Sequence, residues 1–470
     1  MPTNQSFVHP WMANSGSGIK EEMLAETGAA AIEELFSQIP ESHRRRRPLE
    51  LPPSLRSESE LRRHLVTTLD RNRHAEQYLS FLGAGCWQHH VPAVVDEIVG
   101  RAEFLTPVWG SPQSDHGRNQ AWFEFNSQLG ELLHADVVQL PVYSWGCAIG
   151  LAVRMASRMT GRRQLLLPCH IDPERLAVVQ SYCEPPEMPD HVGIVQLAAD
   201  SKTGGIDLAD LRSRISSDTA AVYFEQPGYL GAIDPAADDI AAIARSHGAE
   251  TIVGVDPISL GILRAPGDYG ADIMVGPTQP LGVHMNCGGG VGGFMASRDE
   301  ERYVREFNGF LVSIAPTRKE GEFGFGLASA HQTSYGMRED GKDWTGNSVY
   351  LWAIAGAVYM SLLGPEGFRE VGELIIARAN HAARRLAQID GVRIGTAGSF
   401  FKEFVVDFSA TGRTVSHINR KLRKRHRIFG GKDLSAEFPE MGQSALYCVT
   451  EIHTLDDIDR LVDALEEVLS

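Results

Sequence analysis

Residues 250–261 read ETIVGVDPISLG, and this stretch decides the fold class more than any other. The segment Glu250–Val255 is apolar and rich in β-branched side chains, which predicts a strand buried on both faces. Asp256 and Pro257 follow at once. A buried carboxylate is costly without a partner, and open α/β sheets bind ligands at the carboxyl ends of their strands. Asp256 is therefore a candidate binding residue, although the local sequence by itself favours a cap on the turn that Pro257 begins.

Short apolar runs of the same kind recur on both sides of this strand. They are Gln164–Leu167, Val192–Leu197, Ala220–Phe224 and Ile273–Val275. Amphipathic stretches such as Leu208–Ile215 and Ala236–Ser246 lie between them. Alternating strands and helices predict an α/β domain over residues 80–330, with a mainly parallel sheet covered on both faces.

The two ends of the chain have different patterns. Residues 1–79 contain amphipathic helical stretches, Glu21–Phe36 and Glu58–Leu79, with too few apolar residues for a core, so we expect a helical N-terminal arm. Residues 331–470 predict a small α+β domain. Its expected elements are helices at Tyr350–Leu363, Phe368–Gln388, Ser416–Arg427 and Leu455–Leu469, and strands at Phe404–Phe408 and Ala445–Val449.

Composition excludes several function classes. The 470 residues are 43% hydrophobic and 22% charged, and the net charge of −16 argues against a nucleic-acid-binding protein. The basic run Arg44–Arg47 is more typical of a solvated or subunit-contacting segment. No signal peptide or membrane-spanning stretch is apparent, and the six cysteines form no C-x-x-C pair, so we expect a reduced, cytoplasmic protein.

Three further features suggest chemistry. His170, just after the strand at 164–167, could stack on a cofactor ring, or could be an ordinary satisfied polar side chain. The glycines of 288–293 could cradle a phosphate, or could form a tight turn or a close backbone approach. Asp115 and His116, in a predicted Gly/Ser/Pro-rich loop, suit general acid–base catalysis, or could simply be polar residues of a loop, since no nucleophile or substrate is located beside them. No metal site is expected, because the adjacent side chains of His89-His90 diverge.

Taken in order, many segments resemble one family, the alpha subunit of the glycine cleavage system P-protein, that is, glycine dehydrogenase (decarboxylating) subunit 1. The matching segments are 39–53, 80–85 (SFLGAG), 91–95 (VPAVV), 226–231, 255–261 (VDPISLG), 270–282, 362–367 (LLGPEG), 401–404 (FKEF) and 448–451 (CVTE). No single motif is decisive, but their order over some 400 residues is specific.

The resemblance implies an aspartate-aminotransferase-like large domain, the fold of type I pyridoxal-phosphate (PLP) enzymes. In such enzymes an aspartate, here Asp256, pairs with the pyridinium nitrogen, and the Schiff-base lysine lies a few tens of residues further on. This chain has no lysine between Lys202 and Lys319, and the expected segment, 278–281, reads TQPL. The resemblance thus implies PLP carried by a lysine-bearing beta-type subunit, none covalently bound here, and a lipoyl carrier protein as a further partner.

Four segments depart from the family pattern near the expected site. They are Gln113–Gly117, Tyr143–Cys147, His170–Pro173 and Arg338–Thr345. Loops carry function on a retained scaffold, so the amino acid handled could differ from glycine. The main interpretation is the non-lysine subunit of a glycine decarboxylase-like oligomer. The alternatives are a repurposed homologue in specialised amino-acid metabolism and a catalytically silent scaffold for its partner.

Overall fold

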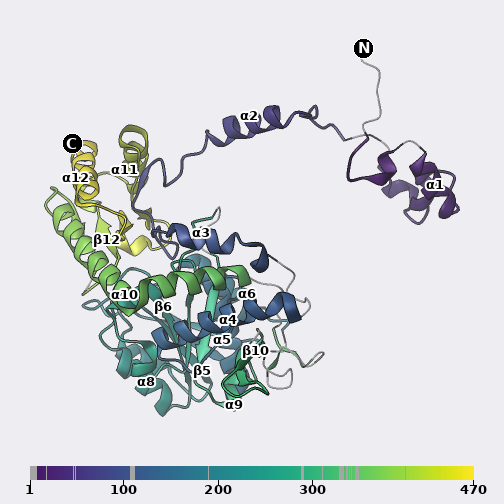
Figure 1. Ribbon diagram of the computed structural model, residues 1–470. Coiled ribbons are helices and arrows are strands. Elements are labelled where there is room, and N and C mark those ends of the chain that lie inside the picture. The colour runs from purple at the N-terminus through teal and green to yellow at the C-terminus, as the bar shows by residue number, and fades with distance from the viewer. Residues whose placement is uncertain are drawn as a thin grey trace. The chain divides into compact units, whose positions relative to one another are not determined.

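The computed structural model separates into two units, Met1–Asn72 and Arg73–Ser470, which are described here one at a time (Figure 1). The described residues are 8–16, 18–45, 47, 49–105, 112–188, 190–286, 291–309, 311–327, 333–334, 337, 339, 341–343, 349–396 and 398–470, with backbone only at 112–116.

The N-terminal unit is helical and has no core. It contains α1 (Ile19–Glu26), α2 (Glu58–Leu69) and three short 3-10 turns, at Ala13–Ser15, Ile32–Phe36 and Glu41–His43. The single helix predicted over 21–36 is wrong, because Gly28 takes a left-handed φ of 72° between α1 and the second 3-10 turn. No described residue of 8–72 is buried.

A seven-stranded sheet forms the centre of the second unit. Its order is β2-β8-β7-β6-β5-β3-β4. The strands are β2 (Val137–Val138), β3 (Gln164–Pro168), β4 (Gly193–Leu197), β5 (Thr219–Gln226), β6 (Glu250–Val255), β7 (Ile273–Pro277) and β8 (Gly293–Ser297). The five predicted strands, β3 to β7, pair in parallel, while β8 is antiparallel to both β7 and β2. The mainly parallel sheet is confirmed.

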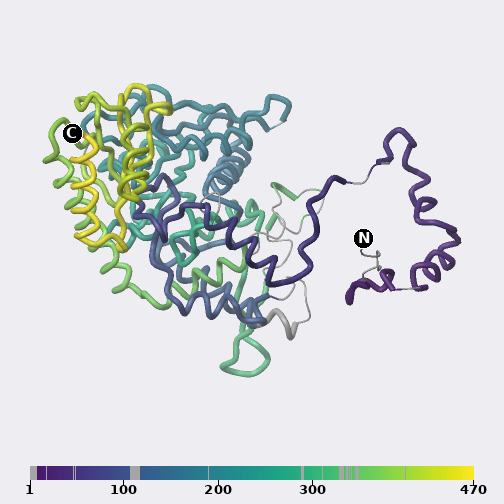
Figure 2. Tube along the Cα trace, turned by 90° about the horizontal axis from the view of Figure 1, so that it is seen from above, coloured from purple at the N-terminus to yellow at the C-terminus, as the bar shows by residue number. Residues whose placement is uncertain are grey.

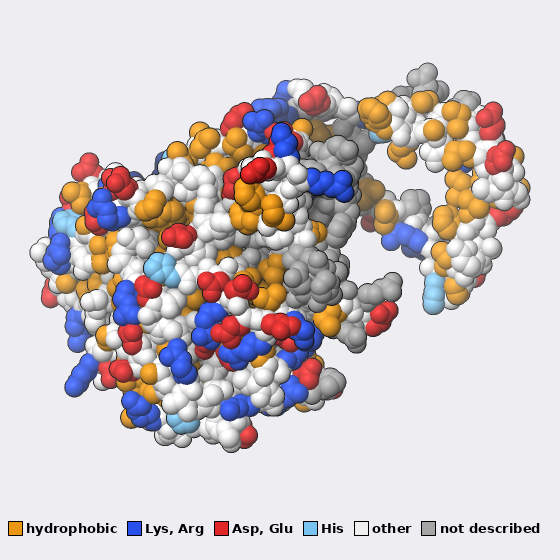
Figure 3. Space-filling model, turned by 60° about the horizontal axis from the view of Figure 1, so that its bottom comes forward, with side chains coloured by type: hydrophobic (Ala, Val, Ile, Leu, Met, Phe, Trp, Pro, Cys, Tyr) orange, Lys and Arg blue, Asp and Glu red, His pale blue; other side chains and the backbone are white. Residues whose placement is uncertain are grey.

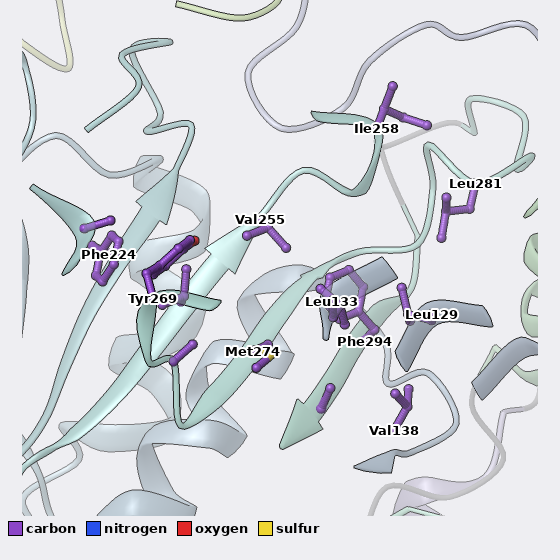
Figure 4. Close-up of a cluster of buried hydrophobic side chains, with 14 of the residues drawn as sticks. Leu129, Leu133, Val138, Phe224, Val255, Ile258, Tyr269, Met274, Leu281 and Phe294 are labelled. Carbon is purple, nitrogen blue, oxygen red and sulfur yellow. The ribbon is translucent and has the colours of Figure 1, made fainter. Parts of the chain in front are cut away.

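Helices cover both faces of this sheet, as its continuous apolar strands require. Successive side chains point to opposite faces, so Val253 belongs to one buried cluster and Ile252 to another. The helices of the second unit up to α10 are α3 (Ala93–Val99), α4 (Pro112–Leu133), α5 (Trp145–Thr160), α6 (Pro173–Cys183), α7 (Leu208–Arg214), α8 (Ala237–Ser246), α9 (Glu301–Val304) and α10 (Tyr350–Leu386). Figure 4 shows the first cluster, in which Leu129 of α4 and Phe294 of β8 lie among side chains of β5, β6 and β7.

A four-stranded antiparallel sheet lies near the C-terminus. Its order is β11-β12-β15-β14, from Arg393–Ile394, Glu403–Asp407, Ser444–Cys448 and Lys432–Asp433. It packs with α11 (Val415–Lys421), a following π-helical turn (Leu422–His426), α12 (Leu455–Leu469) and the second half of α10. Figure 2 shows α12, in yellow, beside the light-green end of α10. The predicted break in α10 is present, since Gly364 has non-helical angles before Pro365.

Short pairings complete the second unit. β1 (Leu79–Ser80) pairs with β13 (Ile428–Phe429), and β9 (Val312–Pro316) forms a hairpin with β10 (Phe323–Leu327).

Acidic and basic side chains intermingle on the face seen in Figure 3. None of the described helices is both long and apolar enough to cross a membrane. The expected boundaries at residues 79 and 330 stay predictions.

Candidate cofactor site

A small cavity lies where the carboxyl ends of β5 and β6 meet the start of β12. Its volume is about 20 Å³, room for about one water molecule. Its walls come from both sheets and from the segment after β1. They are Trp87, Trp145, Arg175, Glu225, Pro227, Gly228, Tyr229, Gly231, Asp256, Phe401, Lys402 and Glu403. This is the edge at which the sequence predicted a ligand site.

Asp256 caps the following turn, as the local sequence favours, and it also has a charged partner in Lys402, while its cofactor contact stays a prediction. Its Oδ1 accepts a hydrogen bond of 3.2 Å from the backbone N–H of Ile258 and so caps the 3-10 turn Pro257–Gly261. Its Oδ2 lies 2.7 Å from the ammonium nitrogen of Lys402. The approach falls outside hydrogen-bonding geometry, so this contact is an ion pair. Both side chains are almost fully buried, at 4% and 3% exposure.

Lys402 is the buried cation of the cavity that the sequence analysis did not single out. The chain has eight lysines, and Lys402 is the only one of them that is buried. Besides Asp256, its Nζ lies 2.8 Å from Nε2 of His89 and 4.0 Å from the ring centre of Trp87. The available signal was a single lysine among the aromatic residues Phe401 and Phe404 at the start of an apolar strand.

His89 links Lys402 to a second carboxylate. An ammonium group can only donate, so Nε2 of His89 accepts from Lys402, and Nδ1–H donates to Oε2 of Glu451 over 2.7 Å. Burial would raise the pKa of Glu451, but the electrostatic attraction of His89, its hydrogen bond and the hydrogen bond from the backbone N–H of His90 lower it to about 2. The carboxylate therefore stays ionised and fixes the orientation of the His89 ring.

Arg175, in the first turn of α6, fills the other side of the cavity. Its guanidinium lies 3.9 Å from the ring centre of Trp145 and donates to Oε2 of Glu225 over 3.0 Å. Asp172 lies 3.6 Å away, and Tyr223 donates to Oε1 of Glu225 over 2.7 Å. Burial lowers the pKa of Arg175, but the two carboxylates outweigh it, so the guanidinium stays charged and internally paired.

Glu403 closes the cavity beside Lys402. Its Oε1 accepts a hydrogen bond of 2.6 Å from the backbone N–H of Ala84. Complete burial outweighs this bond and the nearby cations, and raises the pKa of Glu403 to about 7. A side chain at Gly83 would overlap Oε1 of Glu403, which explains the first glycine of the motif SFLGAG.

Comparison with known proteins identifies the family. The family model "Glycine cleavage system P-protein" matches residues 13–465. The chain belongs to the glycine cleavage system P-protein family. It is 36% identical over 470 residues to the "Probable glycine dehydrogenase (decarboxylating) subunit 1" of Staphylothermus marinus, covering 98% of each chain. It is 35% identical over 467 residues to the protein of the same name from Saccharolobus solfataricus, again covering 98% of each.

Solved structures agree with this assignment. A crystal structure of a glycine decarboxylase (P-protein) in inhibitor-bound form matches with a TM-score of 0.85 and 32% identity, covering 96% of this chain and 98% of that one. A sphingosine-1-phosphate lyase from Burkholderia pseudomallei matches with a TM-score of 0.61 and 16% identity, covering 90% and 93%, and indicates the fold alone. The predicted type I PLP-enzyme fold and the predicted resemblance to the P-protein alpha subunit are both confirmed.

The cavity in this P-protein chain does not fit PLP. A pyridine ring with its phosphate is many times larger than a space of about 20 Å³. Asp256, which would pair with the ring nitrogen, is already paired with Lys402. Trp145, in one of the segments that depart from the family pattern, is buried against Arg175 and occupies space in the same cavity.

The other predicted residues lie elsewhere. His170 lines a neighbouring cavity of about 30 Å³, where its ring packs edge-on against Phe438 at 5.5 Å between centres and lies 3.8 Å from Glu440. Burial lowers the pKa of His170. It does not line the cavity that contains Asp256, and its cofactor contact stays a prediction.

Asp115 and His116 are placed differently from the prediction. They belong to the first turns of α4, so the predicted loop is wrong, and their side chains lie outside the described residues. Their catalytic role therefore stays a prediction. The sequence missed this helix start because Gly117 and the polar residues before it are typical of a loop.

The glycine-rich stretch is described only from Val291 onward. Side chains at Gly292 and Gly293 would overlap Thr278 and the backbone of Ser144, which favours the close-approach interpretation for these two. Asp343, in another divergent segment, pairs with Arg154 and Arg158 at 2.6 and 2.5 Å. Among the described residues no group of acidic, histidine and cysteine side chains could hold a metal ion.

Proposed function

We propose that this chain is the alpha-type, PLP-free subunit of a two-chain, glycine-decarboxylating enzyme of the glycine cleavage system. The observation that carries the proposal is the buried ion pair between Lys402 and Asp256. Lys402 pairs with the aspartate that would otherwise pair with the pyridinium nitrogen of PLP, and the chain has no lysine from 203 to 318. In the complex, PLP bound to the other subunit supplies the electron sink for decarboxylation.

A lysine-bearing beta-type subunit is the proposed partner. The N-terminal unit supports this, because none of its described residues is buried and α2 exposes an apolar stripe, including Leu61, Leu65 and Leu69. An amphipathic helix with an unpaired apolar face needs a surface to cover it. A lipoyl carrier protein is the proposed acceptor of the aminomethyl group, and the cytoplasm is the proposed location, where the five described cysteines, all free, would stay reduced.

Two alternatives remain from the sequence. A silent scaffold is favoured by the internally paired charges of the cavity, which leave Lys402 and Arg175 committed to carboxylates of the same chain. A repurposed homologue acting on another amino acid is favoured by Trp145, whose large ring lies in one of the segments that depart from the family pattern. The repurposed homologue differs from the main proposal in what the assembled complex does with glycine, and the scaffold differs in whether this chain contributes to the reaction.

Reconstitution with the lysine-bearing partner tests the proposal. We expect the complex to exchange the glycine carboxyl carbon with bicarbonate in the presence of lipoyl protein. After borohydride reduction, mass spectrometry should find phosphopyridoxyl-lysine on the partner alone. Modification of Lys402, Lys202, Lys319 or Lys342 would overturn the PLP-free assignment. Absence of glycine exchange, with activity on another amino acid, would establish the repurposed homologue.

Variants of the cavity separate the main proposal from the scaffold. If the alpha-type chain contributes to the reaction, Arg175→Met should change kcat or KM for exchange while the complex stays assembled. An unchanged kcat and KM in an intact complex would leave the scaffold as the role of this chain. Lys432→Met, whose lysine pairs with Glu437 at 3.0 Å on the small sheet, is the matched control.

A further inference from the structure

Lys402 lies in a cage whose parts come from three separated segments of the chain. Asp256 follows β6, Trp87 and His89 follow β1, and Glu451 follows β15. We propose that this cage is an ammonium-binding site for a primary alkylamine, filled in the native chain by its own Lys402. The tethered ammonium then ties the four-stranded sheet to the carboxyl edge of the seven-stranded sheet.

The three walls of the cage each suit an ammonium group. The carboxylate of Asp256 balances the charge at 2.7 Å. The Nε2 lone pair of His89 accepts a hydrogen bond from the ammonium group over 2.8 Å. The indole face of Trp87, at 4.0 Å, supplies a cation–π contact, which is strongest when the site is desolvated.

A second layer of contacts holds these acceptors in place. The backbone N–H of Ile258 fixes Oδ1 of Asp256, and Glu451 fixes the ring of His89. Glu451 is held in turn by the backbone N–H of His90 at 2.7 Å. Acceptors that are oriented before the ligand arrives lose little freedom on binding, so the cage should recognise an ammonium even when the tether is removed.

The backbone around Lys402 shows that the cage spans a junction. Ile233, after β5, donates its N–H to the carbonyl of Ser399 over 2.8 Å, and Val449 donates to the carbonyl of Lys402 over 2.9 Å. The ammonium is thus placed between elements of both sheets. A buried carboxylate left without its cation is strongly unfavourable, so loss of the lysine should loosen this junction.

Truncation and chemical rescue test the proposal on the full-length chain. Lys402→Ala should lower Tm by about 5 °C, because Asp256 loses the cation with which it pairs. The substitution removes the atoms of n-propylammonium, so that amine should raise the Tm of the variant saturably and leave the native chain unchanged. Equal concentrations of n-propanol and sodium chloride should have no effect.

Two matched variants make the result specific. Lys432→Ala truncates a half-buried lysine of the same sheet, paired with Glu437 and the hydroxyl of Tyr229, and should not respond to the amine. Lys402→Ala/Asp256→Asn should lose the response, since the cage has lost its charge. No saturable response in Lys402→Ala, or the same response in Lys432→Ala, would overturn the ammonium site.

A second measurement covers the case in which Lys402→Ala fails to fold. Lys402→Gln keeps most of the side-chain volume and should fold with a lower Tm. Adding Asp256→Asn should recover at least half of that loss, because the buried charge is then absent. A double variant no more stable than Lys402→Gln would contradict the pairing. None of these outcomes depends on which subunit carries PLP. A failure of the ammonium site is therefore distinguishable from a failure of the proposed function.

Discussion

At the scale of single residues, the electrostatics of the site depend on how two buried cations are distributed among four carboxylates. Asp256 pairs with Lys402 and Glu225 with Arg175, and Asp172 lies 3.6 Å from Arg175. Glu403 accepts a hydrogen bond from the backbone N–H of Ala84, and among the described residues no cation forms an ion pair with it. Of these groups Glu403 should therefore be the one whose proton responds to pH near neutrality.

The first prediction concerns the pH dependence of stability. Burial raises the pKa of Glu403 from 4.5 to about 7, so between these values the folded chain binds more protons than the unfolded chain. Its contribution to stability is therefore fully present below pH 4.5 and is lost as pH rises to 7. Glu403→Gln should gain stability relative to the native chain between pH 5 and pH 8, by about 2–3 kcal/mol.

Chemical denaturation at the two pH values measures this difference. Glu451→Gln is the control, because the pKa of Glu451 is lowered to about 2 and its contribution is lost only at more acidic pH. Its effect should be nearly the same at pH 5 and pH 8. A Glu403→Gln effect that does not change between these pH values would contradict the raised pKa.

Sequence reasoning reached only part of this arrangement. Asp256 was predictable, because a carboxylate at the end of an apolar strand must find a partner. Lys402 was not, because its partner lies 146 positions earlier in the chain and no periodic pattern links them. The sequence could show that a Schiff-base lysine is absent near residue 280, but not that a distant lysine pairs with the aspartate expected to hold the pyridinium nitrogen.

At the scale of elements, the loop after β5 presses against the start of β12. Gly231 takes a φ of 91°, and a side chain there would overlap the backbone carbonyl of Glu403. An isolated bridge between Ala232 and Phe400 continues the contact. Close backbone approach therefore joins the two sheets beside the cavity.

The second prediction follows from this contact. Gly231→Ala should destabilise the chain by about 3 kcal/mol, from the strained φ together with the backbone overlap. Gly412→Ala is the control, since Gly412 has a similar positive φ of 65° but open space around it, and should cost about 1 kcal/mol. Thermal unfolding of the two variants measures the difference, and equal losses would show that the close approach is unimportant.

The parallel strands were predictable because each is a continuous apolar run, buried on both faces. The antiparallel β8 and the hairpin of β9 and β10 were missed. β8 has only three apolar residues after its first glycine, glycines interrupt β10, and β9 is largely exposed, so neither a long apolar run nor a clear alternation of apolar and polar residues marks them. The start of α4 was missed for the same reason, since Gly117 lies within it.

At the scale of the whole molecule, the N-terminal arm is the part whose lack of a hydrophobic core was predicted from composition. Burial of its own side chains therefore does not stabilise it. The sequence indicated too few apolar residues for a core, and every described residue of 8–72 is indeed at least partly exposed. The surface proposed to cover the arm is that of the partner subunit, so it could not be derived from one chain.

The last prediction tests whether α2 is a partner-binding element. Leu61, Leu65 and Leu69 recur at every fourth position and are 43%, 48% and 60% exposed, so they form one apolar face. Leu65→Asp should weaken binding of the lysine-bearing subunit at least tenfold, about 1.4 kcal/mol, because the charge would have to be desolvated at the contact. Thr67→Asp adds the same charge on the opposite face of α2 and should leave Kd unchanged. Sedimentation or calorimetric titration measures both, and equal affinity of the two variants would mean that α2 does not contact the partner. The internal stability of residues 73–470 should be the same in both, because α2 contributes no buried residue to that unit.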